Sequence, residues 1–126
     1  MNLDGKRVVI TGASRGIGAE IAKEFAAAGS QVVLSARTES AISNLAREID
    51  GIAIPFDAND PEDVRTYIAN VEDSVGPIDV LINNAGIEKS TLIEDITEKE
   101  IEETLRINLI TPQVLTADVL PRMLSR

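Results

Sequence analysis

Short apolar runs alternate along the chain with longer stretches in which apolar residues recur every three or four positions. The runs lie at 7–11, 31–35, 52–57 and 80–82, and their β-branched residues are typical of buried strands. The longer stretches predict amphipathic helices at 17–28, 39–49, 61–75 and 97–123. Strands that alternate with helices in this way favour a parallel sheet with helices on both faces. We therefore expect one α/β domain over residues 1–126.

Capping residues and prolines sharpen the ends of these helices. Asp60 is placed as an N-cap, with Pro61 at the first helical position. The sequence from Thr97 to Glu100 has the spacing of a capping box, which opens the last helix. Pro112 lies inside that helix and is expected to bend it.

Composition excludes several classes of function. The chain has 126 residues, of which 44% are hydrophobic, and a net charge of −9. Nucleic acid and anionic membranes need a basic partner surface, so we expect binding to neither. Cysteine and histidine are both absent, which effectively excludes a zinc site and a histidine-dependent catalytic triad, and we expect no metal site. No apolar run approaches the ~20 residues of a membrane span, so a soluble, cytoplasmic protein is expected.

The turn between the first strand and the first helix carries three glycines, Gly12, Gly16 and Gly18. A helix N-terminus offers unpaired N–H groups and a partial positive charge, which suit a phosphate. The glycines allow a tight turn, a close approach of the backbone to phosphates and the packing of helix on strand. The alternative is a βα turn that is merely rich in glycine. The strand before the turn and the helix after it favour phosphate binding.

Four motifs in chain order resemble the short-chain dehydrogenase/reductase family. They are the T-G-x-x-x-G-x-G turn from Thr11 to Gly18, Asp57 at the end of the third strand, N-N-A-G at 83–86 and Asn108 in the last helix. The resemblance implies a Rossmann-like, doubly wound parallel sheet of four βα units with strand order 3-2-1-4. It also implies cofactor-binding roles for Gly12, Ser14, Arg15, Gly16, Ile17, Gly18, Arg37, Asp57, Ala58, Asn84, Ala85 and Gly86.

The end of the second strand indicates which dinucleotide is bound. In this fold an acid after that strand bonds the ribose 2′-OH of NAD, whereas an arginine accommodates the 2′-phosphate of NADP. Ala36 lies eighteen residues beyond Gly18, where the acid is expected, and Arg37 follows it. Arg15, in the glycine turn, can approach the same phosphate. We therefore favour NADP(H) over NAD(H), the alternative being that both arginines are solvated surface residues.

The catalytic residues of the family are only partly matched. The resemblance implies a Tyr-x-x-x-Lys pair with a preceding serine, but the single tyrosine, Tyr67, is followed four positions later by Val71. The apolar stripe of its helix explains Tyr67 as a packing residue. Asn108 occupies the position of the family's catalytic asparagine. The alternative for Asn108 is a residue that satisfies backbone groups freed near Pro112.

Three hypotheses follow for the function of the chain. In the first, which we favour, it is the NADP(H)-binding half of an oxidoreductase of this family and is inactive alone, because the Tyr-x-x-x-Lys pair is absent. In the second, it is a carbonyl reductase or alcohol dehydrogenase completed in trans by a chain that carries the missing half. In the third, it is a self-associating structural fragment that binds no cofactor well.

The fourth strand and the last helix are expected to lack neighbours. Without a fifth strand, residues 80–82 form an apolar sheet edge, and such an edge invites pairing with another chain. In the last helix we expect too little packing for Ile101, Leu105, Leu109, Leu115, Val119 and Leu120. We therefore predict a two-fold homodimer, formed by antiparallel pairing of the fourth strands or, alternatively, by packing of the last helices.

Overall fold

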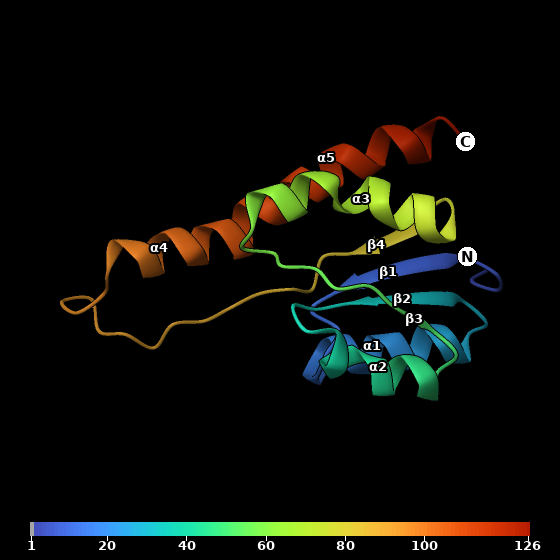
Figure 1. Ribbon diagram of the computed structural model, residues 1–126, viewed down its shortest axis with the longest axis horizontal. Helices are drawn as coiled ribbons and strands as arrows, with labels where there is room; N and C mark the ends of the chain where they lie inside the picture. Colours follow the sequence, from blue (N-terminus) through green and yellow to red (C-terminus); the bar gives the residue numbers. More distant parts are fainter. Residues whose placement is uncertain (1) are drawn as a thin grey trace.

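Four parallel strands form a single sheet in the order β3-β2-β1-β4 (Figure 1). The structure is a computed structural model and describes residues 2–126. The strands are β1 (Arg7–Thr11), β2 (Gln31–Ser35), β3 (Ile52–Ala53) and β4 (Val80–Ile82). The predicted α/β fold and the predicted strand order are therefore confirmed.

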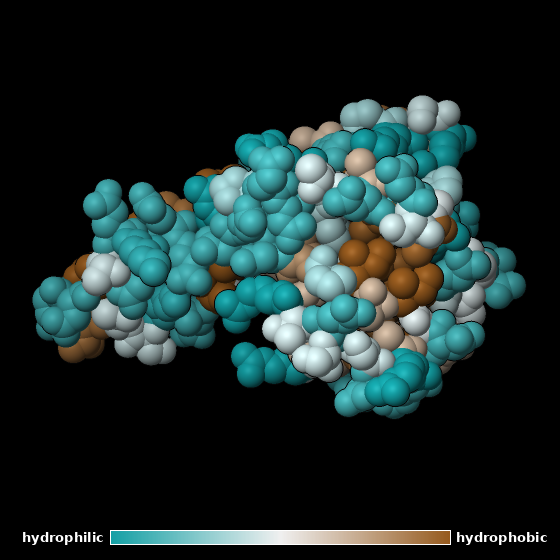
Figure 2. All heavy atoms as spheres, in the orientation of Figure 1, coloured by the Kyte–Doolittle hydropathy of each residue, from teal (hydrophilic) through white to brown (hydrophobic). Residues whose placement is uncertain are grey.

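Helices cover both faces of the sheet, as Figure 1 shows. Two of them, α1 (Gly16–Ala27) and α2 (Glu39–Glu48), lie on one face. The opposite face is covered by α3 (Pro61–Val75) and α5 (Thr111–Leu124). The remaining helix, α4 (Glu98–Leu105), projects away from the sheet together with the segment that leads to it. We call residues 88–105 the arm; on the face drawn in Figure 2 it is mainly hydrophilic.

The hydrophobic core is divided by the sheet into two layers. Successive strand residues point to opposite faces, so Val8 and Ile10 pack toward α1 and α2 while Val9 packs toward α3 and α5. All three side chains are fully buried. Apolar residues on both faces of the strand explain why β1 appears in the sequence as a continuous apolar run. The two layers fix the carboxyl ends of β1, β2 and β4 relative to one another.

The third strand is shorter than the sequence predicts. We expect a strand over 52–57, but regular pairing with β2 is limited to Ile52 and Ala53. Two further backbone bonds continue along β2, from the N–H of Ile54 to the Leu34 carbonyl and from that of Phe56 to the Ala36 carbonyl, both at 2.9 Å. Because β2 itself ends at Ser35, the segment beyond Ile54 has little strand left to pair with.

The predicted last helix is two helices joined by a π-helical turn at Arg106–Ile110. The backbone N–H of Thr111 bonds to the carbonyl of Arg106, five residues earlier. Pro112 follows at the start of α5, so the helix widens just before the proline that was expected to bend it.

The prediction that this whole segment lacks packing partners is wrong for two residues. Leu115 and Val119 are 1% and 3% exposed, because they pack between α3 and the sheet. Ile101 and Leu105, in the arm, are exposed, as are Leu109 and Leu120. In the part of the chain that the structure describes, no helix has the length and hydropathy needed to cross a membrane.

Candidate functional site

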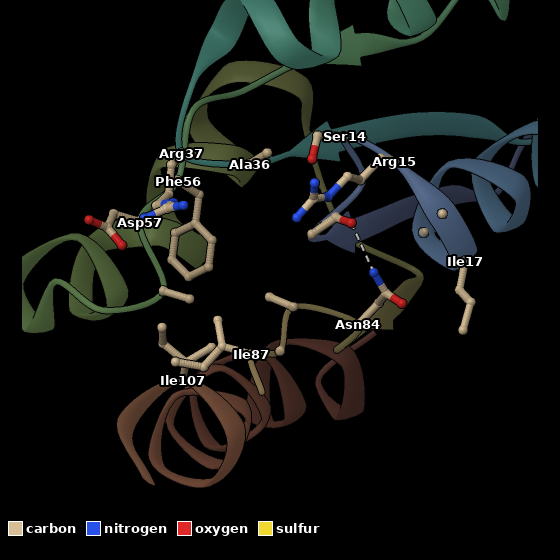
Figure 3. A pocket seen from close by; sticks show the side chains of 16 residues that line it. Ser14, Arg15, Ile17, Ala36, Arg37, Phe56, Asp57, Asn84, Ile87 and Ile107 are labelled. Atoms are coloured by element: carbon tan, nitrogen blue, oxygen red, sulfur yellow. Dashed lines mark hydrogen bonds between the residues drawn. The ribbon is translucent and has the colours of Figure 1, made fainter. Parts of the chain in front are cut away.

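A cavity of about 380 Å³ lies at the carboxyl ends of the strands. Its walls come from the turn after β1, the segments that follow β2 and β3, and the segment that follows β4 (Figure 3). In open α/β sheets ligands bind at this edge, where neighbouring crossovers leave in opposite directions. All twelve residues to which the resemblance assigns cofactor binding line this cavity. The structure therefore brings the predicted residues together around one cavity.

The glycine turn is formed by close backbone approaches. Gly12 has a φ of +67°, and a Cβ there would lie 2.8 Å from the Cα of Ala85. A Cβ at Gly18 would overlap the side-chain amide of Asn84 and come within 2.5 Å of the Gly12 carbonyl oxygen. Gly16 has a φ of +58° but no heavy atom within 4 Å of such a Cβ. Two of the glycines are thus required by space, and the middle one by its left-handed backbone alone.

Thr11 and Asn84 tie the ends of β1 and β4 together. The side-chain amide of Asn84 donates to the carbonyl of Thr11 at 3.0 Å and to that of Gly12, also at 3.0 Å; the second bond is drawn in Figure 3. The Thr11 hydroxyl accepts from the backbone N–H groups of Asn84 at 3.2 Å and Ala85 at 3.1 Å. It donates to the Ile82 carbonyl at 3.4 Å. Asn84 therefore holds the glycine turn in place, a structural role that its sequence motif did not reveal.

The N-terminus of α1 opens into the cavity without a cap of its own. Arg15 is the N-cap residue, its backbone is extended, and its side chain forms no capping hydrogen bond. The first turn of α1 contains no acidic residue. The first N–H groups of a helix have no partner within the helix, so this end of α1 can receive an anion.

Two arginines line the cavity. Arg15 extends from the glycine turn, and Arg37 lies across the cavity beside Asp57 (Figure 3). Both side chains are exposed, and within residues 2–126 neither forms an ion pair. Ala36, which precedes Arg37, is small and lines the same wall. Positive charge is therefore available where the sequence predicts the 2′-phosphate.

Asp57 is partly engaged with its own loop. Its Oδ1 accepts from the N–H of Asn59 at 2.9 Å, and its N–H donates to the carboxylate of Asp63 at 2.7 Å. These bonds fix the loop between β3 and α3 and hold Ala58 in the cavity wall.

Apolar side chains that the sequence analysis did not single out complete the cavity. Phe56, Ile87 and Ile107 line it, and the Phe56 ring points into it (Figure 3). Each is adjacent to a predicted site residue: Phe56 to Asp57, Ile87 to the N-N-A-G sequence and Ile107 to Asn108. That adjacency is the signal that could have found them, because a planar ring needs apolar walls next to its polar contacts.

Asn108 lies in the π-helical turn, and its side-chain amide forms two hydrogen bonds with the backbone of Ile87. Its Oδ1 accepts from the N–H of Ile87 at 2.8 Å, and its Nδ2 donates to the carbonyl of Ile87 at 2.7 Å. The freed backbone groups near Pro112 are therefore not its partners. The side chain instead fixes the segment after β4 against the helix, and its catalytic role stays a prediction.

Tyr67 is a buried packing residue of α3, as predicted. It is 1% exposed and does not line the cavity. Burial raises the pKa of its hydroxyl, which suits a neutral hydrogen-bonding group. Within residues 2–126, no group of three or more acidic residues is arranged to hold a metal ion.

A doubly wound sheet with a glycine turn and an open helix end at this edge defines a nucleotide-binding class of α/β protein. A family model described as short chain dehydrogenase matches residues 6–126. The chain belongs to the short-chain dehydrogenase family.

Individual relatives agree with this assignment. The chain is 38% identical to ketoacyl reductase HetN of Nostoc sp., over 98% of the chain and 45% of that protein. It is 34% identical to gluconate 5-dehydrogenase of Gluconobacter oxydans, over 96% of the chain and 51% of that protein. The chain thus spans about half the length of the curated relatives it matches.

Solved structures match the fold over almost the whole chain. A blue fluorescent protein from a metagenomic library, in complex with NADPH, superimposes with a TM-score of 0.90 at 34% identity. The match covers 98% of this chain and 53% of that one. A short chain dehydrogenase from Burkholderia cenocepacia, in complex with NADP, gives a TM-score of 0.89 at 35% identity and covers 96% of this chain and 52% of that one.

Proposed function

We propose that this chain is the NADP(H)-binding half of a short-chain dehydrogenase-type oxidoreductase. The observation that carries the proposal is the cavity lined by the uncapped N-terminus of α1 and, on opposite sides, by Arg15 and Arg37, neither of which forms an ion pair within residues 2–126. Phosphate groups suit both features, because helix N–H groups and guanidinium forks form charge-assisted hydrogen bonds with them.

The residues present fit a dinucleotide. The turn from Gly12 to Gly18 would hold the pyrophosphate, and the wall of Phe56, Asp57 and Ala58 would receive the adenine. The segment at 84–87 would face the nicotinamide end. When bound, the nicotinamide supplies hydride transfer, while the residues of this chain bind and orient the cofactor.

Preference for NADP(H) over NAD(H) rests on the wall after β2. An acid at this position would bond the 2′-OH of NAD, but the residue is Ala36, and Arg37 follows it. The related structures with bound NADP and NADPH support the same preference.

Fluorescence titration with NADPH and NADH tests the proposal. We expect the chain to bind NADPH more tightly than NADH, and Arg37→Asp to reverse that order. Arg47→Asp is a matched control, because Arg47 is exposed in α2 and outside the cavity. Equal binding of the two cofactors would reject the preference, and binding of neither would reject the function.

We also propose that these 126 residues alone do not reduce carbonyl compounds. Val71 stands where the Tyr-x-x-x-Lys pattern would need lysine after Tyr67, and Tyr67 is buried outside the cavity. Positioned proton transfer contributes roughly 10²–10⁴-fold to such reactions. NADPH-dependent turnover that is lost in Arg15→Ala would overturn this. Restored turnover on co-expression with the carboxyl-terminal half of a relative would favour completion in trans.

We propose that a second copy of the chain covers the exposed edge of β4. Within the described residues β4 pairs only with β1, and a groove lined by Leu81, Thr116 and Leu120 runs beside it. We propose a homodimer through this edge or through the last helix, and light scattering should report it at micromolar concentration. Leu81→Pro should abolish the edge-paired dimer. A monomer would reject both geometries.

A cytoplasmic location stays a prediction.

A further inference from the structure

Tyr67 makes two contacts that connect α3 to the cavity wall. Its ring packs against the ring of Phe56, with centroids 4.2 Å apart and planes inclined by 36°. Its hydroxyl forms a hydrogen bond with the hydroxyl of Ser35, and both side chains are buried. A phenylalanine would fill the same space in the core without needing a partner. The buried hydroxyl pair is therefore a specific link and not a requirement of packing.

Ser35 is the residue at which β2 meets the cavity. Its carbonyl accepts from the N–H of Ala13 in the glycine turn at 3.0 Å. The next two residues, Ala36 and Arg37, line the cavity. A displacement of Ser35 would therefore move the glycine turn and the start of the Arg37 segment relative to each other.

The contact between the rings of Tyr67 and Phe56 supports the same part of the cavity wall through a second residue. The N–H of Phe56 donates to the carbonyl of Ala36 at 2.9 Å, so Phe56 is bonded to the residue that precedes Arg37. Tyr67 thus holds Ser35 by its hydroxyl and Phe56 by its ring, and Ala36 lies between these two attachments. Within residues 2–126, Arg37 itself has no ion pair, so its placement depends on its backbone.

We propose that Tyr67 is a positioning residue that, through Ser35 and Ala36, sets the place of Arg37 and so the preference for NADPH over NADH. The proposal rests on the function proposed above. A guanidinium binds a phosphate by directed, paired hydrogen bonds, so a shift of its backbone weakens that contact selectively. NADH lacks the 2′-phosphate, and its binding depends less on Arg37.

Removing only the Tyr67 hydroxyl leaves the Ser35 hydroxyl without a hydrogen-bond partner. In Tyr67→Phe the Ser35 hydroxyl is buried without its partner, because Tyr67 is the only partner of that oxygen within residues 2–126. A buried polar group without a partner is unfavourable, so Tyr67→Phe lowers the free energy of unfolding in addition to releasing Ser35 from α3. Combining Tyr67→Phe with Ser35→Ala removes both hydroxyls and with them this penalty. The double variant therefore separates stability from positioning.

Calorimetric titration of the full chain with NADPH and with NADH tests the proposal. We expect Tyr67→Phe to weaken NADPH binding by roughly threefold to tenfold, the scale of one impaired charge-assisted hydrogen bond, and NADH binding by less than about twofold. The double variant should regain the free energy of unfolding but not the NADPH preference. Ser30→Ala is the control, because it removes a bond of 2.9 Å to the Leu3 carbonyl at the opposite end of the strands. Its preference should match that of the wild type.

The possible failures are distinguishable. A wild-type chain that binds neither cofactor overturns the proposed function and this inference together. A wild-type preference that survives in Tyr67→Phe, or returns in the double variant, overturns only the role of Tyr67. If Tyr67→Phe fails to fold, the ratio of NADPH to NADH affinity in the double variant tests the role of Tyr67: a ratio equal to that of the wild type overturns it.

Discussion

The helices α1 and α3 both begin at the carboxyl edge of the sheet, yet their first turns are built differently. In α3 the Asp60 carboxylate accepts from the N–H of Glu62 at 2.9 Å, and acidic residues occupy the first turn. In α1 the N-cap is Arg15, whose side chain has no acceptor for the helix N–H groups and adds positive charge. The start of α3 is capped by its own side chain, whereas the first N–H groups of α1 have no side-chain acceptor. Of the two, only α1 borders the cavity.

The open start of α1 lies in a fold whose buried side-chain polar groups are otherwise satisfied. No buried side-chain nitrogen or oxygen among the described residues lacks a hydrogen-bond partner. Even α4, on the projecting arm, begins with a complete capping box between Thr97 and Glu100. The start of α2 at Thr38 also lacks a side-chain cap, but the uncapped first turn of α1 lines the cavity and that of α2 does not.

The largest effect is expected from adding a side chain to the glycine turn. Gly12 and Gly16 share the left-handed backbone, but only a Cβ at Gly12 would meet neighbouring backbone, at 2.8 Å from Ala85 Cα. Gly12→Ala should lower the free energy of unfolding by about 2–5 kcal/mol, from backbone strain plus steric overlap. Gly16→Ala should lower it by about 1 kcal/mol. Urea denaturation measures both, and equal losses would contradict the close approach assigned to Gly12.

The second prediction concerns a variant in which α1 receives an acidic N-cap like that of α3. Arg15→Ala removes only the guanidinium, whereas Arg15→Asp also places a carboxylate at the open helix end, as Asp60 does in α3. We expect NADPH to bind Arg15→Asp roughly tenfold more weakly than Arg15→Ala. The new carboxylate would accept from the first N–H groups of α1 and would repel the phosphates of the cofactor. The cofactor-free Arg15→Asp chain should be more stable than Arg15→Ala by about 1 kcal/mol. Equal affinities in the two variants would mean that the helix end does not contact the anion.

Much of this contrast could be predicted from local sequence. Asp60 with Pro61, and Thr97 with Glu100, are signals contained within a few residues, and the structure has both caps as predicted. The glycine turn and twelve residues of the cavity were also predicted, because the motifs of the family resemblance follow the strands directly, but Phe56, Ile87 and Ile107 were not. The strand order followed from the family resemblance and is confirmed.

Contacts between distant segments were not predictable in this way. Asn84 bonds to the glycine turn and Asn108 to Ile87, and neither motif indicates its partner. The link between Tyr67 and Ser35 joins residues 32 positions apart, so no local pattern could suggest it. The burial of Leu115 was missed for a related reason: the packing of α5 on α3 depends on the angle between the helices and not on either sequence alone.

The third prediction removes the cap of α3. Asp60→Ala should lower the free energy of unfolding by about 1 kcal/mol, because the N–H of Glu62 loses its acceptor. Asp60→Asn keeps an acceptor oxygen and should retain most of the stability. Thermal unfolding measures both variants. NADPH affinity should change by less than about twofold in either variant, since a helix that caps itself contributes no anion site. A large loss of affinity would remove the distinction between the two helix ends.

The smallest effect is expected at α4, where the cap depends on pH. Glu100 accepts from the backbone N–H of Thr97 at 2.9 Å. That bond, followed by bonds from the Thr91 and Thr97 hydroxyls, holds the pKa of Glu100 below its ordinary value. A carboxyl whose pKa is lowered by folding contributes stability above its unfolded pKa of about 4.3, and this is lost as the pH falls through the lower folded value. Amide hydrogen exchange in the first turn of α4 should therefore accelerate below about pH 4, beyond the trend of the rest of the chain. Glu100→Gln, which cannot titrate, should show no such pH dependence. The same acceleration in Glu100→Gln would mean that other carboxyls, and not this cap, control the fraying of the arm.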